Sequence, residues 1–195
     1  MRRFDRELDA MKSLTRRALI FLTGFLASRR AVSLEAPWTR LRRVVTSRDR
    51  QGRAVVIADG EPTNVVYFGG TRVTRLWESA GLPAELPLRA DAGLSAGNAY
   101  RENFSGTAFY VTEIPGGERA PKIPMHRNVT LDYMAILSGR LRLKLPDREL
   151  DLQQGDTLIQ GGNEHSFENP WPESCLLLFV VVSGRNTAVE PLDKL

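Results

Sequence analysis

MHRNVTLDYMAILSG, residues 125–139, contains one of the two histidines of the chain, and GDTLIQGGNEHSFEN, residues 155–169, contains the other. Side chains of a strand alternate between two faces, so His126 and Asp132, six residues apart, share one face of an unbroken strand. His165 follows a glycine-rich loop at the start of another strand. Two imidazoles and a carboxylate are a minimal ligand set for a divalent transition metal that keeps open coordination positions. The pattern thus offers these three residues as ligands for iron, manganese, nickel or zinc.

The same residues also have ordinary structural roles. A single histidine is commonly a surface residue or a hydrogen-bonded residue of the core. Asp132 could anchor a turn or pair with Arg127 or Arg140. Tyr133 should point to the opposite face from Asp132, into the core or an interface. Spacing alone leaves both interpretations open.

Strand-like runs recur along the chain after residue 52. RLRLKL, residues 140–145, alternates basic residues with leucine, which predicts one solvated and one buried face. SCLLLFVVV, residues 174–182, is continuously apolar, as expected for a central strand buried on both faces. Strands spaced about 8–12 residues apart with turns between them predict a sandwich or small barrel. The other predicted strands lie at residues 53–60, 63–70, 71–79, 107–114, 130–137, 149–153 and 157–160.

The segment of residues 80–106 is rich in proline, alanine and glycine and shows no clear period. Long irregular connections are uncommon in compact domains and are often functional. We therefore expect residues 83–99 to cover part of the mouth of a barrel.

Charge is unevenly divided along the chain. Residues 1–50 hold thirteen Lys or Arg and five Asp or Glu, whereas the other 145 residues hold fourteen and eighteen. The body is therefore mildly acidic, and it has no basic stripe with interleaved aromatic residues, so we expect no nucleic-acid partner. The single cysteine, Cys175, lies in an apolar run and is expected to be a buried, inert thiol.

Residues 1–38 form a basic extension with an apolar run at residues 18–27. The run is too short for a transmembrane span, which needs about 20 residues. A positive segment, a short apolar run and small residues outline a signal peptide, but the arginines directly after the run disfavour export. A helix lying on the body and a start codon placed too early are the alternatives. We expect a cytoplasmic protein, with export as the second possibility.

The two quoted stretches resemble the two cupin motifs. In the first motif His-x-His is followed by Glu and then Gly, and HRNVTLDYMAILSG, residues 126–139, is similar to it. The second motif runs from Gly through Pro-x-Gly to His and Asn, and Gly162, His165 and Asn169 keep its spacing. The chain also resembles small single-domain cupin-2 proteins, from about Leu41 onward. This resemblance implies an all-β fold, the cupin double-stranded β-helix or jelly-roll barrel with extra N-terminal strands.

The resemblance also implies a domain organisation. We expect N-terminal strands and the irregular connection at residues 39–106, the cupin barrel at residues 107–183, and a tail at residues 184–195. Small cupins commonly pair through a strand edge, because a dimer removes an exposed edge that is otherwise a liability. A homodimer is therefore expected.

Four positions depart from the cupin pattern. Asn128 stands where cupins have the second His, and Asp132 stands where they have Glu. Gln160 replaces Pro, and Phe167 replaces the Trp of the narrower group. Because aspartate is one methylene shorter than glutamate, Asp132 could bind substrate or act as a base instead of reaching a metal.

The resemblance implies a metal site with fewer ligands than the full cupin pattern has. It implies His126, Asp132 and His165 as ligands of a divalent transition metal. Asn128 would be a fourth ligand, or it would hydrogen-bond to a ligand without contacting the metal. The residues expected to line the substrate pocket are Glu164, Gln160 and Phe167.

Two classes of function follow from these residues. The first is a metal-dependent enzyme of the oxygenase, decarboxylase, isomerase or dehydratase type that acts on a small oxygenated organic molecule. The second is a non-catalytic small-molecule-binding barrel with a vestigial metal site. The cupin barrel hosts both classes, so the fold does not choose between them.

Overall fold

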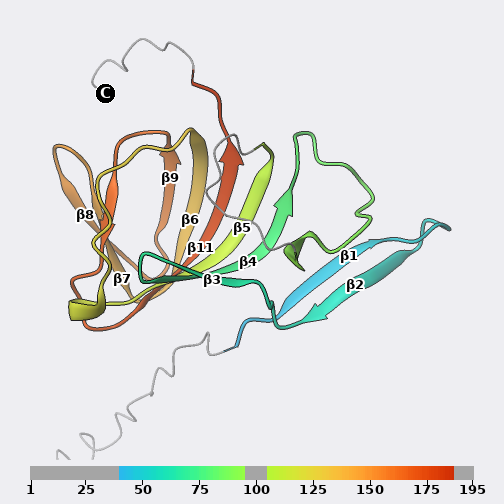
Figure 1. Cartoon of the computed structure of the whole chain (residues 1–195), viewed down its shortest axis with the longest axis horizontal. Helices are drawn as coiled ribbons and strands as arrows, with labels where there is room; N and C mark the ends of the chain where they lie inside the picture. The colour runs from blue at the N-terminus through green and yellow to red at the C-terminus, as the bar shows by residue number, and fades with distance from the viewer. Residues whose placement is uncertain (1–39, 95–104, 187–195) are drawn as a thin grey trace, which may run out of the picture. The chain divides into compact units, whose positions relative to one another are not determined.

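The computed structural model describes residues 40–94 and 105–186 (Figure 1). The predictions for residues 1–38 and for the end of the tail lie outside this part of the chain. Within it no helix is long and apolar enough to cross a bilayer. The regular elements are eleven strands and two short 3-10 helices, η1 (Ala92–Leu94) and η2 (Gly117–Arg119). The all-β class is confirmed.

Six antiparallel strands form the main sheet, in the order β3-β4-β5-β11-β6-β9. A second sheet has the order β10-β7-β8. This is the arrangement of a cupin-type jelly roll, with the two sheets enclosing the core. The main-sheet strands are β3 (Val65–Phe68), β4 (Thr71–Ser79), β5 (Thr107–Ile114), β11 (Cys175–Ser183), β6 (Thr130–Ser138) and β9 (Thr157–Gly161). The second sheet contains β7 (Arg140–Lys144), β8 (Glu149–Gln153) and β10 (Ser166–Glu168).

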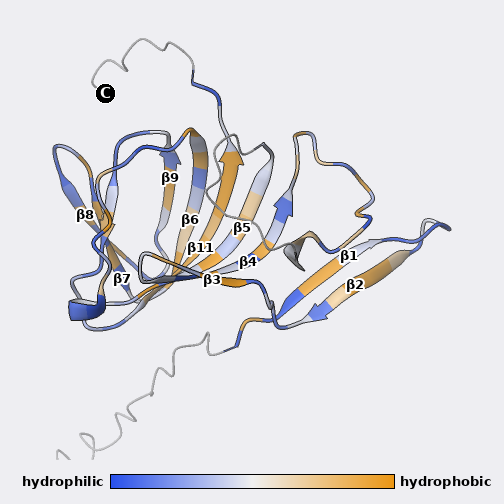
Figure 2. Cartoon of the chain, in the orientation of Figure 1, coloured by the Kyte–Doolittle hydropathy of each residue, from blue (hydrophilic) through white to orange (hydrophobic). Residues whose placement is uncertain are grey.

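The apolar run of β11 occupies the middle of the main sheet, between β5 and β6. Each residue of this strand is buried or half-buried, as predicted for a strand covered on both faces. Figure 2 shows apolar residues along β11. In β7 the alternation also holds, since Leu141 and Leu143 are fully buried between solvated basic residues.

The core has two apolar clusters. One joins the sheets: Ile136, Leu141 and Leu177 pack together with Leu152 and Phe167 against them. The other lies over the opposite half of the main sheet and contains Val73, Ala108, Tyr110 and Val181, with Phe179 against it. Burial of these side chains supplies the main driving force for closing the barrel.

Strands upstream of Thr107 belong to the same sheet as the predicted barrel. β4 pairs along β5, and β3 pairs with β4, so the extra N-terminal strands extend the barrel wall. A separate hairpin, β1 (Arg43–Arg48) with β2 (Ala54–Gly60), precedes them. The guanidinium of Arg43 donates to both carboxylate oxygens of Asp91 and so lowers the pKa of that carboxyl. This ion pair ties the hairpin to the irregular connection.

Candidate functional site

The two histidines lie side by side although 38 residues separate them in the sequence. The backbone N–H of each donates to the carbonyl of the other, at 2.9 Å in both directions. The centroids of the imidazole rings of His126 and His165 are 4.4 Å apart. An antiparallel bridge therefore sets the separation of the two rings, and the two quoted stretches form one site.

Backbone carbonyls fix the tautomer of both rings. Nδ1 of His126 lies 3.0 Å from the carbonyl oxygen of Pro124, and Nδ1 of His165 lies 2.9 Å from that of Asn163. A carbonyl only accepts, so each Nδ1 carries the proton and each Nε2 keeps a free lone pair. Burial lowers the pKa of His165; the Asn163 carbonyl partly offsets this effect, and protonation of His126 would lower the pKa of His165 further. Metal-binding histidines commonly hold their second nitrogen in this way.

Asp132 is buried on the inner face of β6, with 3% of its surface exposed. It pairs in register with Gln160 on β9 and with Val181 on β11. In the part of the chain that the structure describes, its Oδ1 has no hydrogen-bond partner. Burial raises the pKa of the Asp132 carboxyl. The nearby Thr130 hydroxyl and the His126 ring each lower this pKa and so offset part of the rise. Among the described residues, the Thr130 hydroxyl nevertheless has no well-aligned hydrogen-bond partner.

Buried polar atoms without partners gather around this carboxyl. Besides Asp132 Oδ1, they are the hydroxyl of Thr130 and both amide atoms of Gln160. An unsatisfied buried polar group costs about 1–3 kcal/mol, so such a group in a native structure usually has a functional explanation or an ordered water. The unpaired carboxylate oxygen and the two free Nε2 atoms have the chemistry of a divalent-metal donor set. Yet within residues 40–94 and 105–186 no three His, Cys, Asp or Glu side chains are gathered closely enough to hold an ion.

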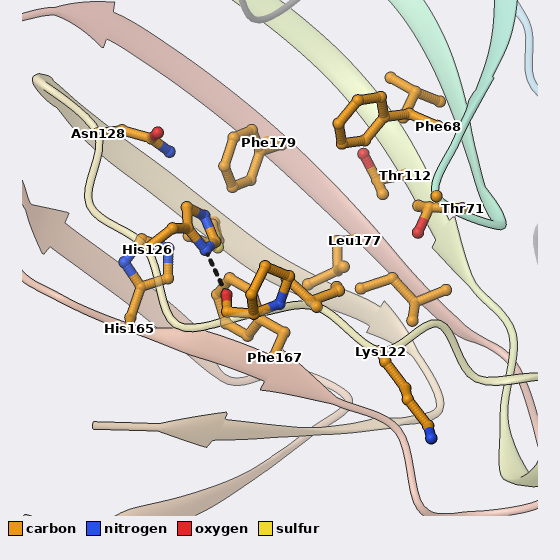
Figure 3. A pocket seen from close by; sticks show the side chains of 16 residues that line it. Phe68, Thr71, Thr112, Lys122, His126, Asn128, His165, Phe167, Leu177 and Phe179 are labelled. Carbon is orange, nitrogen blue, oxygen red and sulfur yellow. Dashed lines mark hydrogen bonds between the residues drawn. The ribbon is translucent and has the colours of Figure 1, made fainter. Parts of the chain in front are cut away.

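A cavity of about 480 Å³ opens beside the histidines. This volume is in the usual range for small-molecule sites, about 300–1,000 Å³. Figure 3 shows the two imidazoles and Asn128 on one side, with Phe68, Thr112 and Thr71 on the other. The walls between them are mainly apolar; they include Val73, Ile114, Ile123, Met134, Phe167, Leu177 and Phe179.

Of the three residues predicted to line the pocket, one lines the cavity and two do not. Phe167 lines the cavity, with its ring edge-on to His165 at 5.4 Å between centroids. Gln160 is buried beside Asp132 and is not part of the cavity wall, and Glu164 is exposed on its loop. Tyr133 points outward and is half exposed, opposite to Asp132.

Several residues of the cavity wall were not predicted from the sequence. Thr71, Val73 and Thr112 come from β4 and β5, whose alternation could have placed them on the inner face. Lys122 lies in an irregular segment where no periodic signal exists. Residues 80–94 of the irregular connection line no part of this cavity, and residues 95–99 lie outside the described chain.

Cys175 takes no part in this chemistry. Its side chain is fully buried, and burial raises the pKa of its thiol to about 12. A thiol that stays protonated at neutral pH is a poor nucleophile. It packs with Ile136 and Leu177 as an apolar residue of the core.

Replacing Gln160 with methionine is expected to raise the free energy of unfolding by about 1–2 kcal/mol, because it removes two buried amide atoms that have no partner. Methionine is similar in size and adapts to irregular spaces. Gln153→Met, on the exposed side of β8, is the control and should change stability little. Urea denaturation measures both. A loss of stability in Gln160→Met would show that the amide is hydrogen-bonded in solution.

The chain resembles several solved structures in its fold. No protein-family model and no curated protein sequence matches the chain. The chain is similar to the cupin domain of Schizosaccharomyces pombe Cnp3, with 15% identity and a TM-score of 0.46 over 73% of this chain and 87% of that one. It is also similar to a putative ethanolamine utilization protein Q from Salmonella typhimurium, with 14% identity and a TM-score of 0.40 over 75% of this chain and 99% of that one. The DMSP lyase DddQ from Ruegeria pomeroyi has 19% identity and a TM-score of 0.35, over 42% of this chain and 41% of that one. These three proteins are compared with the chain in fold only, and their activities are not assigned to it.

Proposed function

We propose that this cupin-type barrel binds a divalent transition metal on His126 and His165 and acts on a small oxygen-bearing organic molecule in the adjoining cavity. The observation that carries the proposal is the paired imidazoles, each with Nδ1 held by a backbone carbonyl and Nε2 free. Both rings border a cavity large enough for a small molecule. Iron, manganese, nickel and zinc all accept imidazole ligands.

Asp132 is the proposed third ligand. Its buried Oδ1 has no hydrogen-bond partner among the described residues, and a nearby cation would offset the cost of burying that carboxylate. Asn128 borders the cavity and is the proposed fourth ligand or hydrogen-bonding neighbour. The homodimer inferred from the sequence stays a prediction.

The bound ion would supply a Lewis acid for an oxygen of the organic molecule, or a redox centre if it is iron. The protein's own residues provide the surroundings. The carbonyls of Pro124 and Asn163 hold the rings in one orientation. Phe167, Phe179 and the other apolar wall residues exclude water from the bound molecule, which strengthens electrostatic interactions at the site. The proposed reactions are of the oxygenase, decarboxylase, isomerase or dehydratase type.

A second candidate is a non-catalytic barrel that binds a small molecule without metal. It is favoured by one observation: within the described chain no third His, Cys, Asp or Glu joins the two histidines in a compact group. The apolar cavity would then bind its ligand directly, with the free Nε2 atoms accepting hydrogen bonds.

Metal analysis of protein purified without added metal tests the proposal. Wild type should contain near-stoichiometric transition metal, and His126→Ala or His165→Ala should lose it. Asp132→Asn should weaken metal binding if the carboxylate is the third ligand. Glu164→Gln is the matched control, because this carboxylate is adjacent to His165 but exposed and away from the cavity. A bound ion also stabilises the fold by mass action, about 2.7 kcal/mol at a hundredfold excess over Kd.

The competing result is equally clear. A wild-type protein without metal, whose melting temperature does not respond to added Fe, Mn, Ni or Zn, would contradict the metal site. Retention of metal in both histidine variants would contradict the ligand assignment. In the first case the non-catalytic binding barrel becomes the preferred function.

A further inference from the structure

We propose that Lys122 determines the ligand class, and that the cavity takes an organic acid with one carboxylate and an apolar body. The carboxylate would pair with Lys122, while the apolar body fills the cavity toward the histidines. The inference rests on the proposed function, because it concerns the ligand of the same cavity. It does not require that a metal be present.

The charge on the cavity wall comes from one side chain. Among the described residues that line the cavity, Lys122 is the single Lys, Arg, Asp or Glu. No ion pair joins Lys122 to another of the described residues, whereas Lys144, on β7, pairs with Glu149 and Glu168. The nearby carboxyls, Asp132 and Glu164, do not border the cavity. The wall therefore carries an uncompensated positive charge, which favours an anion.

Lys122 lies at the edge of the cavity, with its side chain directed outward (Figure 3). Its side chain is exposed, and Figure 3 shows it extending away from the two imidazoles. The neighbouring Pro121 lies beside Gly70 in the turn between β3 and β4, where a Cβ built on Gly70 would be 3.6 Å from Pro121 Cβ. Phe68, from the end of β3, borders the same cavity and is 63% exposed, as expected at a mouth. The flexible four-carbon stem of lysine allows the ammonium to reach a group at this mouth.

The apolar side chains on the rest of the cavity wall favour a ligand whose body is apolar. Met134, Leu177 and Phe179 project from the inner face of the main sheet into the cavity. A purely apolar ligand would gain nothing from Lys122, and a carboxylate that lay among these apolar side chains would bury its charge at high cost. With the carboxylate at the mouth, the charge stays partly hydrated while the body is buried. This orientation leaves the far end of the ligand at the histidines.

The test compares straight-chain acids from butanoate to decanoate with their primary amides, by isothermal titration calorimetry on the full chain. Wild type should bind the best acid about three- to fivefold more tightly than its amide, the usual size of an exposed ion pair. Lys122→Ala should abolish this preference and Lys122→Arg should keep it. Lys122→Glu should reverse it, and raising the salt concentration should reduce it in wild type. Lys144→Ala, a lysine outside the cavity, is the control and should bind like wild type.

Three results would overturn the inference. They are equal binding of acid and amide by wild type, an acid preference that survives in Lys122→Ala, and no binding of any acid in the series at millimolar concentration. Metal content, measured in the same preparations, separates this inference from the proposed metal site. A metal-free protein that keeps a Lys122-dependent acid preference contradicts only the metal. A metal-loaded protein without that preference contradicts only the role of Lys122.

Discussion

Gly139→Ala is expected to lower the free energy of unfolding by about 2–5 kcal/mol, the sum of a strained backbone and an overpacked contact. Gly139 joins β6 to β7 with φ at +76°, a conformation that side-chain-bearing residues rarely adopt. A Cβ at this position would lie 2.4 Å from the carbonyl oxygen of Ser174 and 3.0 Å from Cα of Cys175. Both neighbours are backbone atoms at the start of the central strand, so the sheet itself would have to move.

Gly155→Ala is the matched control for this change. Gly155 also has a positive φ, +93°, but a Cβ there would meet nothing within 4 Å. It should therefore lose only the conformational part, about 1–2 kcal/mol. Urea denaturation of the three proteins measures the difference between them. Equal losses in both variants would show that the turn at Gly139 relaxes without disturbing β11.

Asn169→Ala is expected to cost about 3–4 kcal/mol, because one buried and one partly buried carbonyl lose their donor and a backbone N–H loses its acceptor. The side chain of Asn169 is fully buried. Its Nδ2 donates to the carbonyls of Ile114, at 3.1 Å, and Glu173, at 2.9 Å, and its Oδ1 accepts from the N–H of Trp171 at 3.3 Å. The side chain thus ties the end of β5 to the turn that leads into β11.

Asn163→Ala provides the comparison for Asn169→Ala. Asn163 is exposed, and its Nδ2 makes one hydrogen bond, to the carbonyl of Glu164. Its truncation should change stability by less than about 0.5 kcal/mol, as is usual for surface positions. Thermal unfolding followed by circular dichroism distinguishes the two variants. If Asn169→Ala melts within a few degrees of wild type, the turn is held by other contacts.

These two predictions concern residues that the cupin resemblance marked without giving a reason. Gly139 and Asn169 act in folding, through a tight turn and a buried amide, and neither borders the cavity. Gly162 has a related role, since a Cβ there would lie 3.3 Å from the backbone oxygen of Asn128. Of the positions that keep the cupin pattern, the two histidines border the cavity, and the glycines and Asn169 support the frame that brings them together.

The sequence by itself determined the strands and the pairing of the two histidine-bearing stretches. Alternation in RLRLKL and the continuous apolar run of β11 are local properties, and the structure places both as predicted. Turn residues such as Gly139 mark strand ends for an equally local reason, because only glycine readily adopts a positive φ. Most strands could therefore be located before any contact was known, whereas β1 (Arg43–Arg48) was not among the strands predicted individually.

The tertiary structure alone decided which side chains share the cavity. Same-face alternation put Asp132 with His126; sheet register sets Asp132 beside Gln160, and neither Asp132 nor Gln160 lines the cavity. Lys122 comes to the mouth through an irregular segment that no periodicity describes. Alternation along one strand fixes only a direction, inward or outward. Which inward side chains meet depends on register and on how the sheets curve around the core, and these are properties of the whole barrel.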